Sequence, residues 1–449
     1  MNGLRELRTA AREIFDAALA AVDARRAVLD AVAFDGATLR VGGARFELRG
    51  GRSEVYSVAL GKAAAAMASA LDERLGEALA GGVLSAPPSG FRLSGRWRVY
   101  AGGHPLPNGD SIEAARAAFE LLRAADDAEA PVVFLVSGGG SAMLELPRDA
   151  RLTLEELREA NRVLVTCGAP IGEVNAVRRA LSAVKGGGLA SRAPRAKQVT
   201  LVVSDVAPGR AYDVASGPTL GAPPDPPDVA EIVSRYELAS KLPAAVLCAV
   251  EESLTHGPAR TPPETQRTFQ VLLDNASACE AAARAARERG FAVGLARDVA
   301  EQHVEEGAAE LVLRLFSLYA GGSGVCLISG GEFSCPVRGG GTGGRNSETA
   351  LRVAFEFEKL SAGRGARAGL APAHAVALCA GTDGIDGNSP AAGALADGTT
   401  VNRARALGLD AHKFLDESDA YTLFDKLGDA IVTGPTGANV RDLRILLAV

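Results

Sequence analysis

The amino-acid sequence predicts an α/β protein of two domains, in which strands and helices alternate along most of the chain. Apolar runs of roughly four to eight residues, typical of strands buried on both faces, are followed by turns rich in Gly, Ser or Asp and then by helical segments. The chain has 449 residues, enough for more than one domain. We therefore expect a Rossmann-like parallel sheet in the first domain and a smaller α/β second domain.

The expected strand–turn–helix units follow one another in order. The first is "EVYSVALGKAAAAMASALDERLG" at residues 54–76, in which Gly61 makes the turn and an Ala-rich helix follows. The second, at residues 131–146, joins the strand "VVFLV" to a glycine turn. Further units of this plan occupy residues 198–210, 269–290, 324–335 and 375–394. Such alternation favours largely parallel sheets.

Proline-rich stretches suggest where the domains divide. "GAPPDPPDVAEIV" at residues 221–233 ends any sheet element, and "HGPARTPPETQR" at residues 256–267 is a second break. We expect a Rossmann-like domain at residues 1–245 and an α/β domain at residues 246–449. The last segment, residues 429–449, is a candidate to return to the first domain.

Composition narrows the function classes. The 48 basic and 54 acidic residues give a net charge of −6, without the basic excess that nucleic-acid binding calls for. Six widely spaced cysteines predict reduced thiols in a cytoplasmic protein. The charged N-terminus does not resemble a signal peptide, and no apolar run reaches the ~20 residues that span a bilayer. These features fit a protein that handles small molecules.

The first motif with chemical meaning is "SGGGS", Ser137 to Ser141, directly after an apolar strand. Successive glycines (Gly138, Gly139 and Gly140) expose backbone N–H groups to an anion, and the serines add hydroxyl donors. A helix beginning near Ser141 would add its positive end. The sequence predicts a phosphate site here, with a ligand-free turn as the alternative. It is not a Walker A loop, because the Gly-Lys-Ser/Thr ending is missing.

The second glycine motif is "RGGGTGGRNSE" at residues 338–348. It contains G-x-G-x-x-G, but five glycines in the six residues 339–344 make that match nearly unavoidable. The preceding strand also ends too early for a dinucleotide fingerprint, which sits directly at a strand end. Arg345 is more informative, because a guanidinium at a helix start is a bidentate partner for phosphate oxygens. A solvated surface arginine is the alternative.

Two further candidates follow the ends of early expected elements. Lys62 opens the helix after the first strand and could reach a phosphate as a point charge, although such lysines are commonly solvated. His104, in the loop "GHPLPNGDS", is a candidate base or ligand, with a hydrogen-bonded structural histidine as the alternative.

Aspartates at strand ends suggest a metal. Asp205 follows one strand, and Asp383 and Asp386 lie in a glycine-rich turn after another. Mg²⁺ is commonly held by one or two carboxylates together with substrate phosphates. Turn capping is an equally weighted alternative. Phosphoryl transfer is indicated by the combination of two glycine turns, a cation at each of two helix starts and these acids.

Taken in order, the motifs resemble the class II glycerate kinase family, the glycerate 2-kinases with a MOFRL-type C-terminal domain. The resemblance runs from "LGKAAAAM" through "SGGGSAML", "NAVRRALSAVKGGGLA" and "GGGTGGRNSETAL" to "TGPTGANVRDL", and covers about residues 5–449. It implies ATP- and Mg²⁺-dependent phosphorylation of D-glycerate, at the 2-hydroxyl, in a cleft between two α/β domains.

The resemblance also implies roles for particular residues. Lys62 and Arg345 fall on the catalytic positions. The family motifs imply phosphate or nucleotide binding by Ser137 to Ser141, Lys185, Glu332, Gly343, Gly344 and Asn346. They imply substrate binding by Asn175 and Arg178, and metal binding by Asp205, Asp383 and Asp386.

Two departures from the family pattern concern substrate and metal. "PGRAYD" keeps Gly209 but has Arg210 and Ala211 where acids are common, so Asp205 or Asp213 would have to compensate. Ala180 replaces a histidine of the "NxVR" motif.

Two other functions stay open at this point. An NAD(P)H-dependent hydroxypyruvate reductase is one, although no early strand leads directly into G-x-G-x-x-G. A catalytically inactive binding or regulatory relative is the other. The expected partners are ATP and D-glycerate, without nucleic acid or membrane, and a homodimer is the assembly considered.

Overall fold

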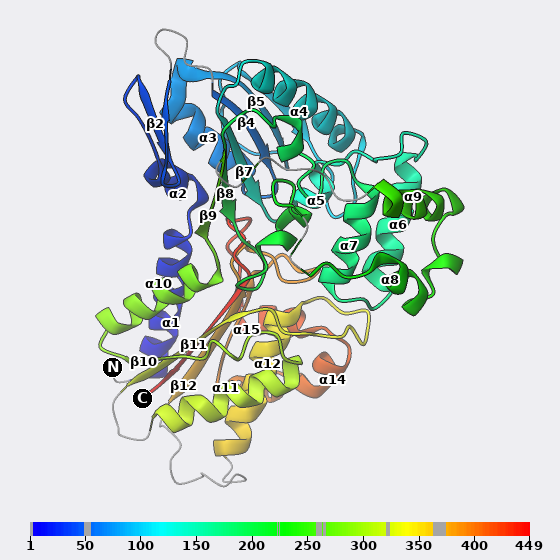
Figure 1. The fold of residues 1–449 in the computed structure, drawn as a ribbon. Helices are drawn as coiled ribbons and strands as arrows, with labels where there is room; N and C mark the ends of the chain where they lie inside the picture. Colours follow the sequence, from blue (N-terminus) through cyan, green and yellow to red (C-terminus); the bar gives the residue numbers. More distant parts are fainter. Residues whose placement is uncertain are drawn as a thin grey trace. The chain divides into compact units, whose positions relative to one another are not determined.

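The computed structural model describes residues 3–48, 55–221, 223, 225–256, 263, 266–319, 324–361 and 374–449. The chain divides into two compact units, one formed by Met1–Asp23 with Leu273–Val449 and the other by Ala24–Leu272. We call them the discontinuous unit and the central unit. Both have the expected alternation of strands and helices (Figure 1). Among the described residues, no helix combines the length and the apolar character that crossing a membrane requires.

The central unit is built on a sheet whose six described strands lie in the order β6-β5-β4-β7-β8-β9. These are β4 (Val55–Leu60), β5 (Leu79–Ala86), β6 (Trp97–Ala101), β7 (Val132–Ser137), β8 (Gln198–Val203) and β9 (Arg267–Leu273). The pairs β4–β5, β5–β6, β4–β7 and β7–β8 are parallel. Counted along the chain, the order is 3-2-1-4-5-6, that of the doubly wound nucleotide-binding folds. The predicted Rossmann-like sheet is therefore confirmed.

Helices of the central unit cover this sheet and form a helical cluster of their own. α3 (Ala64–Leu75) and α4 (Gly109–Asp127) pack on the strands, and α4 shares a core with alternate residues of β7. α6, α7, α8 and α9 enclose a separate apolar core. Their bounds are Leu154–Thr166, Ile171–Leu181, Val229–Arg235 and Ala244–His256. Single-turn α5 (Gly140–Met143) follows β7, and a small antiparallel sheet of β1 (Val32–Phe34), β2 (Thr38–Val41) and β3 (Ala44–Glu47) follows α2 (Ala24–Ala31).

The discontinuous unit holds a second six-stranded sheet among its described residues, in the order β10-β11-β15-β12-β13-β14. Its strands are β10 (Ala292–Leu295), β11 (Val325–Gly331), β12 (Ala375–Gly381), β13 (Gly393–Asp397), β14 (Ala430–Ile431) and β15 (Asp442–Ala448). Among the pairs of described strands, β10–β11 is parallel and the others are antiparallel. The expectation of largely parallel sheets is therefore wrong in this unit, because the final strand inserts antiparallel between β11 and β12 and because β13 is antiparallel to both of its neighbours.

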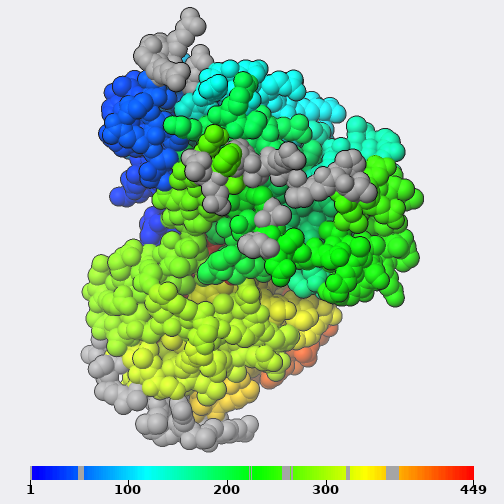
Figure 2. Space-filling model, viewed as in Figure 1, coloured from blue at the N-terminus to red at the C-terminus, as the bar shows by residue number. Residues whose placement is uncertain are grey.

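Both faces of the second sheet are covered by helices. α1 (Leu4–Ala21) and α10 (Asn275–Glu288) pack on Cys326 and Ile328 of β11, while α11 (Val304–Leu318) and α12 (Arg345–Ser361) pack on Val325 and Leu327. The alternation follows from the two-residue period of a strand. The yellow-green segments that include α10 and α11 form much of the visible surface of this unit (Figure 2). Its remaining helices are α13 (Thr400–Ala406), α14 (Ala411–Asp416) and α15 (Ala420–Leu427).

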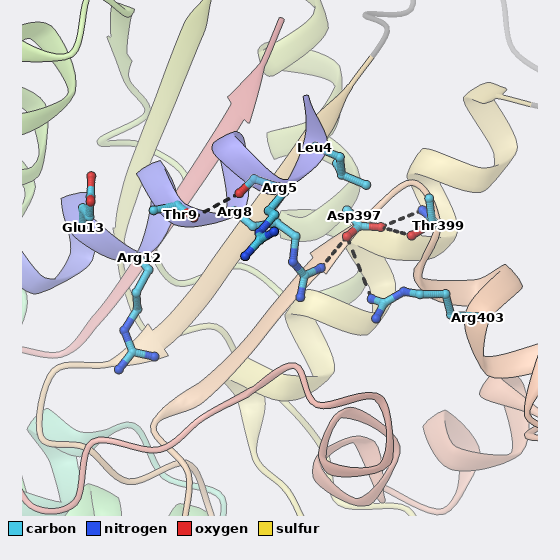
Figure 3. A pocket seen from close by; sticks show the side chains of 9 residues that line it. All are labelled: Leu4, Arg5, Arg8, Thr9, Arg12, Glu13, Asp397, Thr399 and Arg403. Carbon is cyan, nitrogen blue, oxygen red and sulfur yellow. Dashed lines mark hydrogen bonds and ion pairs between the residues drawn. The ribbon is translucent and has the colours of Figure 1, made fainter. Parts of the chain in front are cut away.

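The N-terminal helix is fastened to the discontinuous unit by a charged clasp. Arg8 of α1 forms ion pairs with Asp397 and Asp429, whose side chains are 1% and 3% exposed. Arg403 pairs with Asp429 and lies near Asp397, and Thr399 donates to Asp397 (Figure 3). The clasp lines one side of a cavity of about 690 Å³ that Arg5 and Arg12 also line.

This division differs from the expected domain boundary at residues 245/246. That boundary falls inside α9, which packs on α7 within the central unit. The returning segment is α1 rather than the end of the chain. β15, the proposed candidate to return, has seven buried residues and pairs on both sides within the second sheet. The break expected at residues 256–267 lies largely outside the described residues.

Candidate active site

Two strand ends meet at the point where the strand order of the central sheet reverses. Gly61 follows β4 with φ +115°, and a Cβ there would lie 2.4 Å from the carbonyl oxygen of Ser137, at the end of β7. The backbone N–H of Lys62 donates to the carbonyl of Gly138 at 2.8 Å. Ligands of doubly wound sheets bind at such reversals, so this edge is the candidate site of the central unit.

Three side chains converge on the glycine turn after β7. A Cβ on Gly138 would lie 2.0 Å from Oδ2 of Asp205, which follows β8. A Cβ on Gly139 would lie 3.0 Å from Cδ2 of His104 and 3.3 Å from Cγ of Lys62. The glycines are thus required by crowding as well as by the positive φ of Gly139. Lys62, His104 and Asp205, which came from three separate motifs, lie around one turn.

The hydroxyl groups of both serines in this turn form hydrogen bonds within the protein. The hydroxyl oxygen of Ser137 accepts from the N–H of Ala63 at 3.0 Å, and the residue is 1% exposed. The hydroxyl of Ser141 lies 3.0 Å from that of Ser216. The helix expected here is only the single turn α5, which offers little helix dipole. Both hydroxyls thus have partners within the protein, and the expected phosphate-donor role of Ser137 and Ser141 stays a prediction.

A polar network connects the turn to α7. Asn175, 2% exposed, accepts from the hydroxyl of Ser216 at 3.0 Å and donates to Asp213 at 3.0 Å. The Nε of Arg178 donates to Asn161 at 2.9 Å. Burial lowers the pKa of Arg178, against the opposing charge of Glu145. No carboxylate of the described chain forms an ion pair with Arg178, so this desolvated guanidinium has capacity for an anionic ligand.

Within the "PGRAYD" segment, Arg210 neutralises the charge of Asp213. Arg210 pairs with Asp213 through Nε at 2.9 Å and Nη2 at 2.7 Å, and Arg179 lies 3.8 Å away from the same carboxylate. The Asp213 side chain is 10% exposed and also accepts from Asn175. Asp205 and Asp213 were the two acids that could compensate for the missing family acids. Asp213 is paired with arginines, whereas Asp205 lies beside the glycine turn.

Lys185 lies inside the central unit. Its ammonium forms an ion pair with Glu145, and the two side chains are 1% and 6% exposed. Burial lowers the pKa of Lys185, opposed by the Glu145 charge, and Ser182 donates to the same carboxylate at 2.5 Å. The buried acid already balances the ammonium charge, which favours a structural role for Lys185, and the expected phosphate contact stays a prediction.

Arg345 is the first residue of α12 in the discontinuous unit and is held from two sides. Its Nε and Nη2 donate to the two oxygens of Asp442 at 2.5 and 3.2 Å, and Nη2 also lies 2.8 Å from Oε1 of Glu332. Burial by itself would lower the pKa of Arg345, but Asp442 and Glu332 raise it above its ordinary value. Nη1 forms no hydrogen bond within the described chain and stays available to a ligand. Glu332, an expected phosphate or nucleotide contact, is an ion-pair partner of this arginine, and the expected contact stays a prediction.

The glycine loop before Arg345 is tied down by acids and amides. Thr342 N–H donates to Asp419 at 2.8 Å, and Gly343 N–H donates to Asn388 at 2.8 Å. Gly344 N–H donates to the hydroxyl of Ser347 at 3.1 Å. These N–H groups already have partners within the protein, and the expected phosphate cradle at Gly343 and Gly344 stays a prediction. The loop leads directly into α12, whose first residue is Arg345.

Asp386 caps α12. It accepts from the N–H groups of Asn346 and Ser347 at 2.9 and 2.8 Å and is 1% exposed. Burial raises its pKa, which the helix N–H groups oppose. The capping contacts favour a structural role for Asp386, and its expected role as a metal ligand stays a prediction. Asn346, the second residue of α12, is 2% exposed and contacts Asp386 through its backbone N–H.

Asp383 accepts from the N–H of Ile385 at 3.1 Å, the Asx-type turn considered as its alternative. The described residues contain no group of three His, Cys, Asp or Glu side chains arranged to hold a metal. Asp442, which sequence reasoning missed, is the main addition to the site. Its only signal was an acid at the start of the buried final strand.

The strand order of the central sheet is that of the doubly wound nucleotide-binding folds, and Lys62 lies at its reversal point. Residues 10–251 match the family described as "Domain of unknown function (DUF4147)", and residues 325–442 match the MOFRL family.

Relatives extend this match to nearly the full chain. A "Glycerate 2-kinase" of Pyrococcus horikoshii is 33% identical over 96% of this chain and 94% of its own. A "Putative hydroxypyruvate reductase" of Agrobacterium vitis is 35% identical over 97% and 93%. A crystal structure of glycerate kinase from Thermotoga maritima superposes with a TM-score of 0.80 at 31% identity, over 99% and 100% of the chains. The chain belongs to the class II glycerate kinase family and is a kinase.

Proposed function

We propose that the protein transfers the γ-phosphoryl group of ATP to the 2-hydroxyl of D-glycerate, giving 2-phosphoglycerate. The observation that carries this proposal is the placement of Lys62 against the Gly138–Gly139 turn, at the reversal point of a nucleotide-binding sheet. The names of the relatives and the sequence resemblance supply the substrate.

Two cations are proposed to act on the transferring group. Lys62 would supply a mobile point charge, and Arg345 would supply a planar guanidinium whose orientation Asp442 maintains. Charge develops on the phosphoryl oxygens in the transition state, and pre-oriented cations stabilise it without reorganisation. Nη1 of Arg345 is the group proposed to contact phosphate.

Arg178 is proposed to bind the glycerate carboxylate. Desolvation by burial lowers the pKa of the Arg178 guanidinium. The same group donates hydrogen bonds to the side chains of Asn161 and Asn175 at 2.9 and 3.5 Å. A bidentate carboxylate would satisfy it and select an acid over a neutral polyol. Asn175 then acts by holding Arg178 and Asp213 in place.

Asp205 is proposed to accept the proton of the substrate hydroxyl, and its carboxylate beside the glycine turn would also hold Mg²⁺. When bound, the ion neutralises charge on the β- and γ-phosphates. A cytoplasmic location and a homodimer stay predictions, the second testable by light scattering.

The direct test is a coupled ADP-release assay with purified protein, MgATP and D-glycerate, followed by phosphorus NMR of the product. The proposal expects ADP formation that depends on D-glycerate and a phosphorus signal of 2-phosphoglycerate. The reductase alternative is tested with the same preparation, NADH and hydroxypyruvate. A steady loss of NADH absorbance without ADP formation in the first assay would overturn the proposal.

A further inference from the structure

A second cavity of the central unit lies over β5 and β6, beside the loop that joins these two strands. Its volume is about 660 Å³, within the range of small-molecule sites. The main walls are apolar or aromatic and come from both strands and the loop between them: Leu84, Ala86, Phe91, Trp97, Tyr100 and Ala101. Nothing in the proposed phosphoryl transfer uses these residues.

The walls of this cavity are held in place by specific contacts. Ser94 of the loop donates to Asp72 of α3 through its backbone N–H and its hydroxyl, both at 2.7 Å. The Trp97 ring packs flat on Gly82 of β5, where a Cβ would lie 2.4 Å from Cε3. The cavity is therefore a built feature of the sheet edge, because both a strand glycine and a helix acid maintain its walls.

A backbone hydrogen bond connects the wall of the cavity to the segment that carries Lys62. Ser85 lies between the wall residues Leu84 and Ala86, and its carbonyl accepts from the N–H of Gly61 at 3.1 Å. Ala65, which also lines the cavity, lies in the first turn of α3, three residues after Lys62. A ligand in the cavity would thus have one end within reach of the proposed phosphate position.

The chemistry of the walls selects a flat apolar group. Asp110 is the one charged residue among the described residues that line the cavity, and it would repel phosphate or a carboxylate. Glycerate, which is small, anionic and hydroxylated, gains nothing from apolar walls. A purine presents π faces to aromatic rings and buries apolar area against Leu84 and Ala86.

We propose that this cavity holds the purine base of the nucleotide donor, with the phosphates extending along Gly61 to the turn at Gly139. The assignment rests on the proposed function, since the kinase reaction supplies the nucleotide. It places the base over β5 and β6, on the side of the reversal point away from β8.

The chain offers a direct probe, because Trp97 is its only tryptophan. Titration with ATP should change the tryptophan emission saturably, whereas inorganic tripolyphosphate, which lacks a base, should leave it unchanged. No response to ATP, or an equal response to both ligands, would overturn the assignment. This measurement needs no turnover.

A variant tests the same cavity through kinetics. Ala101→Phe fills it from an exposed position at the end of β6, and should raise the KM for ATP at least about tenfold with the KM for D-glycerate unchanged. Val165→Phe, at a 67% exposed position of α6, is the matched control and should behave as wild type. An unchanged KM for ATP in Ala101→Phe overturns the base site, while absence of ADP release in the wild type overturns the proposed function instead.

Discussion

Asp442 accepts hydrogen bonds from both Nε and Nη2 of Arg345, and the Asp442 side chain is 3% exposed. The acid stands at the start of the central strand β15, while the arginine begins α12. A buried carboxylate on a rigid strand therefore sets the direction of the guanidinium proposed to contact the transferring phosphoryl group. Orientation of this kind matters because a misplacement of about 1 Å can cost roughly 10²-fold in rate.

Asp442→Asn keeps the size of the side chain and removes its charge, so this position offers Arg345 one acceptor oxygen where it had two. We expect kcat to fall roughly 10- to 100-fold, with a smaller change in the KM for D-glycerate. Steady-state kinetics on a variant whose circular dichroism matches wild type checks this. Unaltered kcat would show that Asp442 does not position Arg345.

Gly138→Ala places a methyl group where Oδ2 of Asp205 lies 2.0 Å away. Because the carboxylate ends a flexible side chain, Asp205 should move at little cost in stability, and kcat should fall about 10²-fold. Gly109→Ala is the control, since a Cβ there meets nothing within 4 Å. Equal activity in the two variants would remove Asp205 from the site.

Lys185→Met leaves the buried Glu145 without its cation, which typically costs about 3–5 kcal/mol of unfolding free energy. Adding Glu145→Gln should recover part of that loss. Urea unfolding measures both, and the KM for ATP should stay near wild type in whichever variant folds. A raised KM with unchanged stability would restore Lys185 as a phosphate ligand.

The clasp at α1 makes stability depend on pH. Burial opposes ionisation of Asp397, but Thr399 and Arg8 outweigh it and lower its pKa below the ordinary value. The contribution is therefore fully present above the unfolded pKa of aspartate and is lost as pH falls through the lower folded pKa. Arg8→Met should destabilise by about 3 kcal/mol at neutral pH.

The exposed pair Arg12–Asp16 provides the control for the clasp, and Arg12→Met should change stability by less than ~1 kcal/mol. The difference between the two variants should shrink as pH falls into the range in which aspartates protonate. Unfolding free energies at pH 7 and in acid measure this. A difference independent of pH would rule out the ionised clasp.

Sequence patterns were sufficient for the elements and strand ends that carry Lys62, Gly138 and Asp205, because buried strands read as apolar runs ending at glycine. They failed where partners are distant in the chain. The loop before Arg345 donates backbone hydrogen bonds to Asn388 and Asp419, and these two residues lie more than 40 positions further along the chain. Arg8 likewise gives no local sign that its acids lie near the opposite end of the chain.

The most direct test of the account compares Arg345→Ala with Arg338→Ala, a half-exposed arginine of the same loop that pairs with Glu348 at 3.3 Å. The measurement is the single-turnover rate of ADP formation with saturating D-glycerate. The account predicts a loss of at least ~10³-fold for Arg345→Ala and a rate near wild type for Arg338→Ala. Near-normal turnover in Arg345→Ala would contradict it.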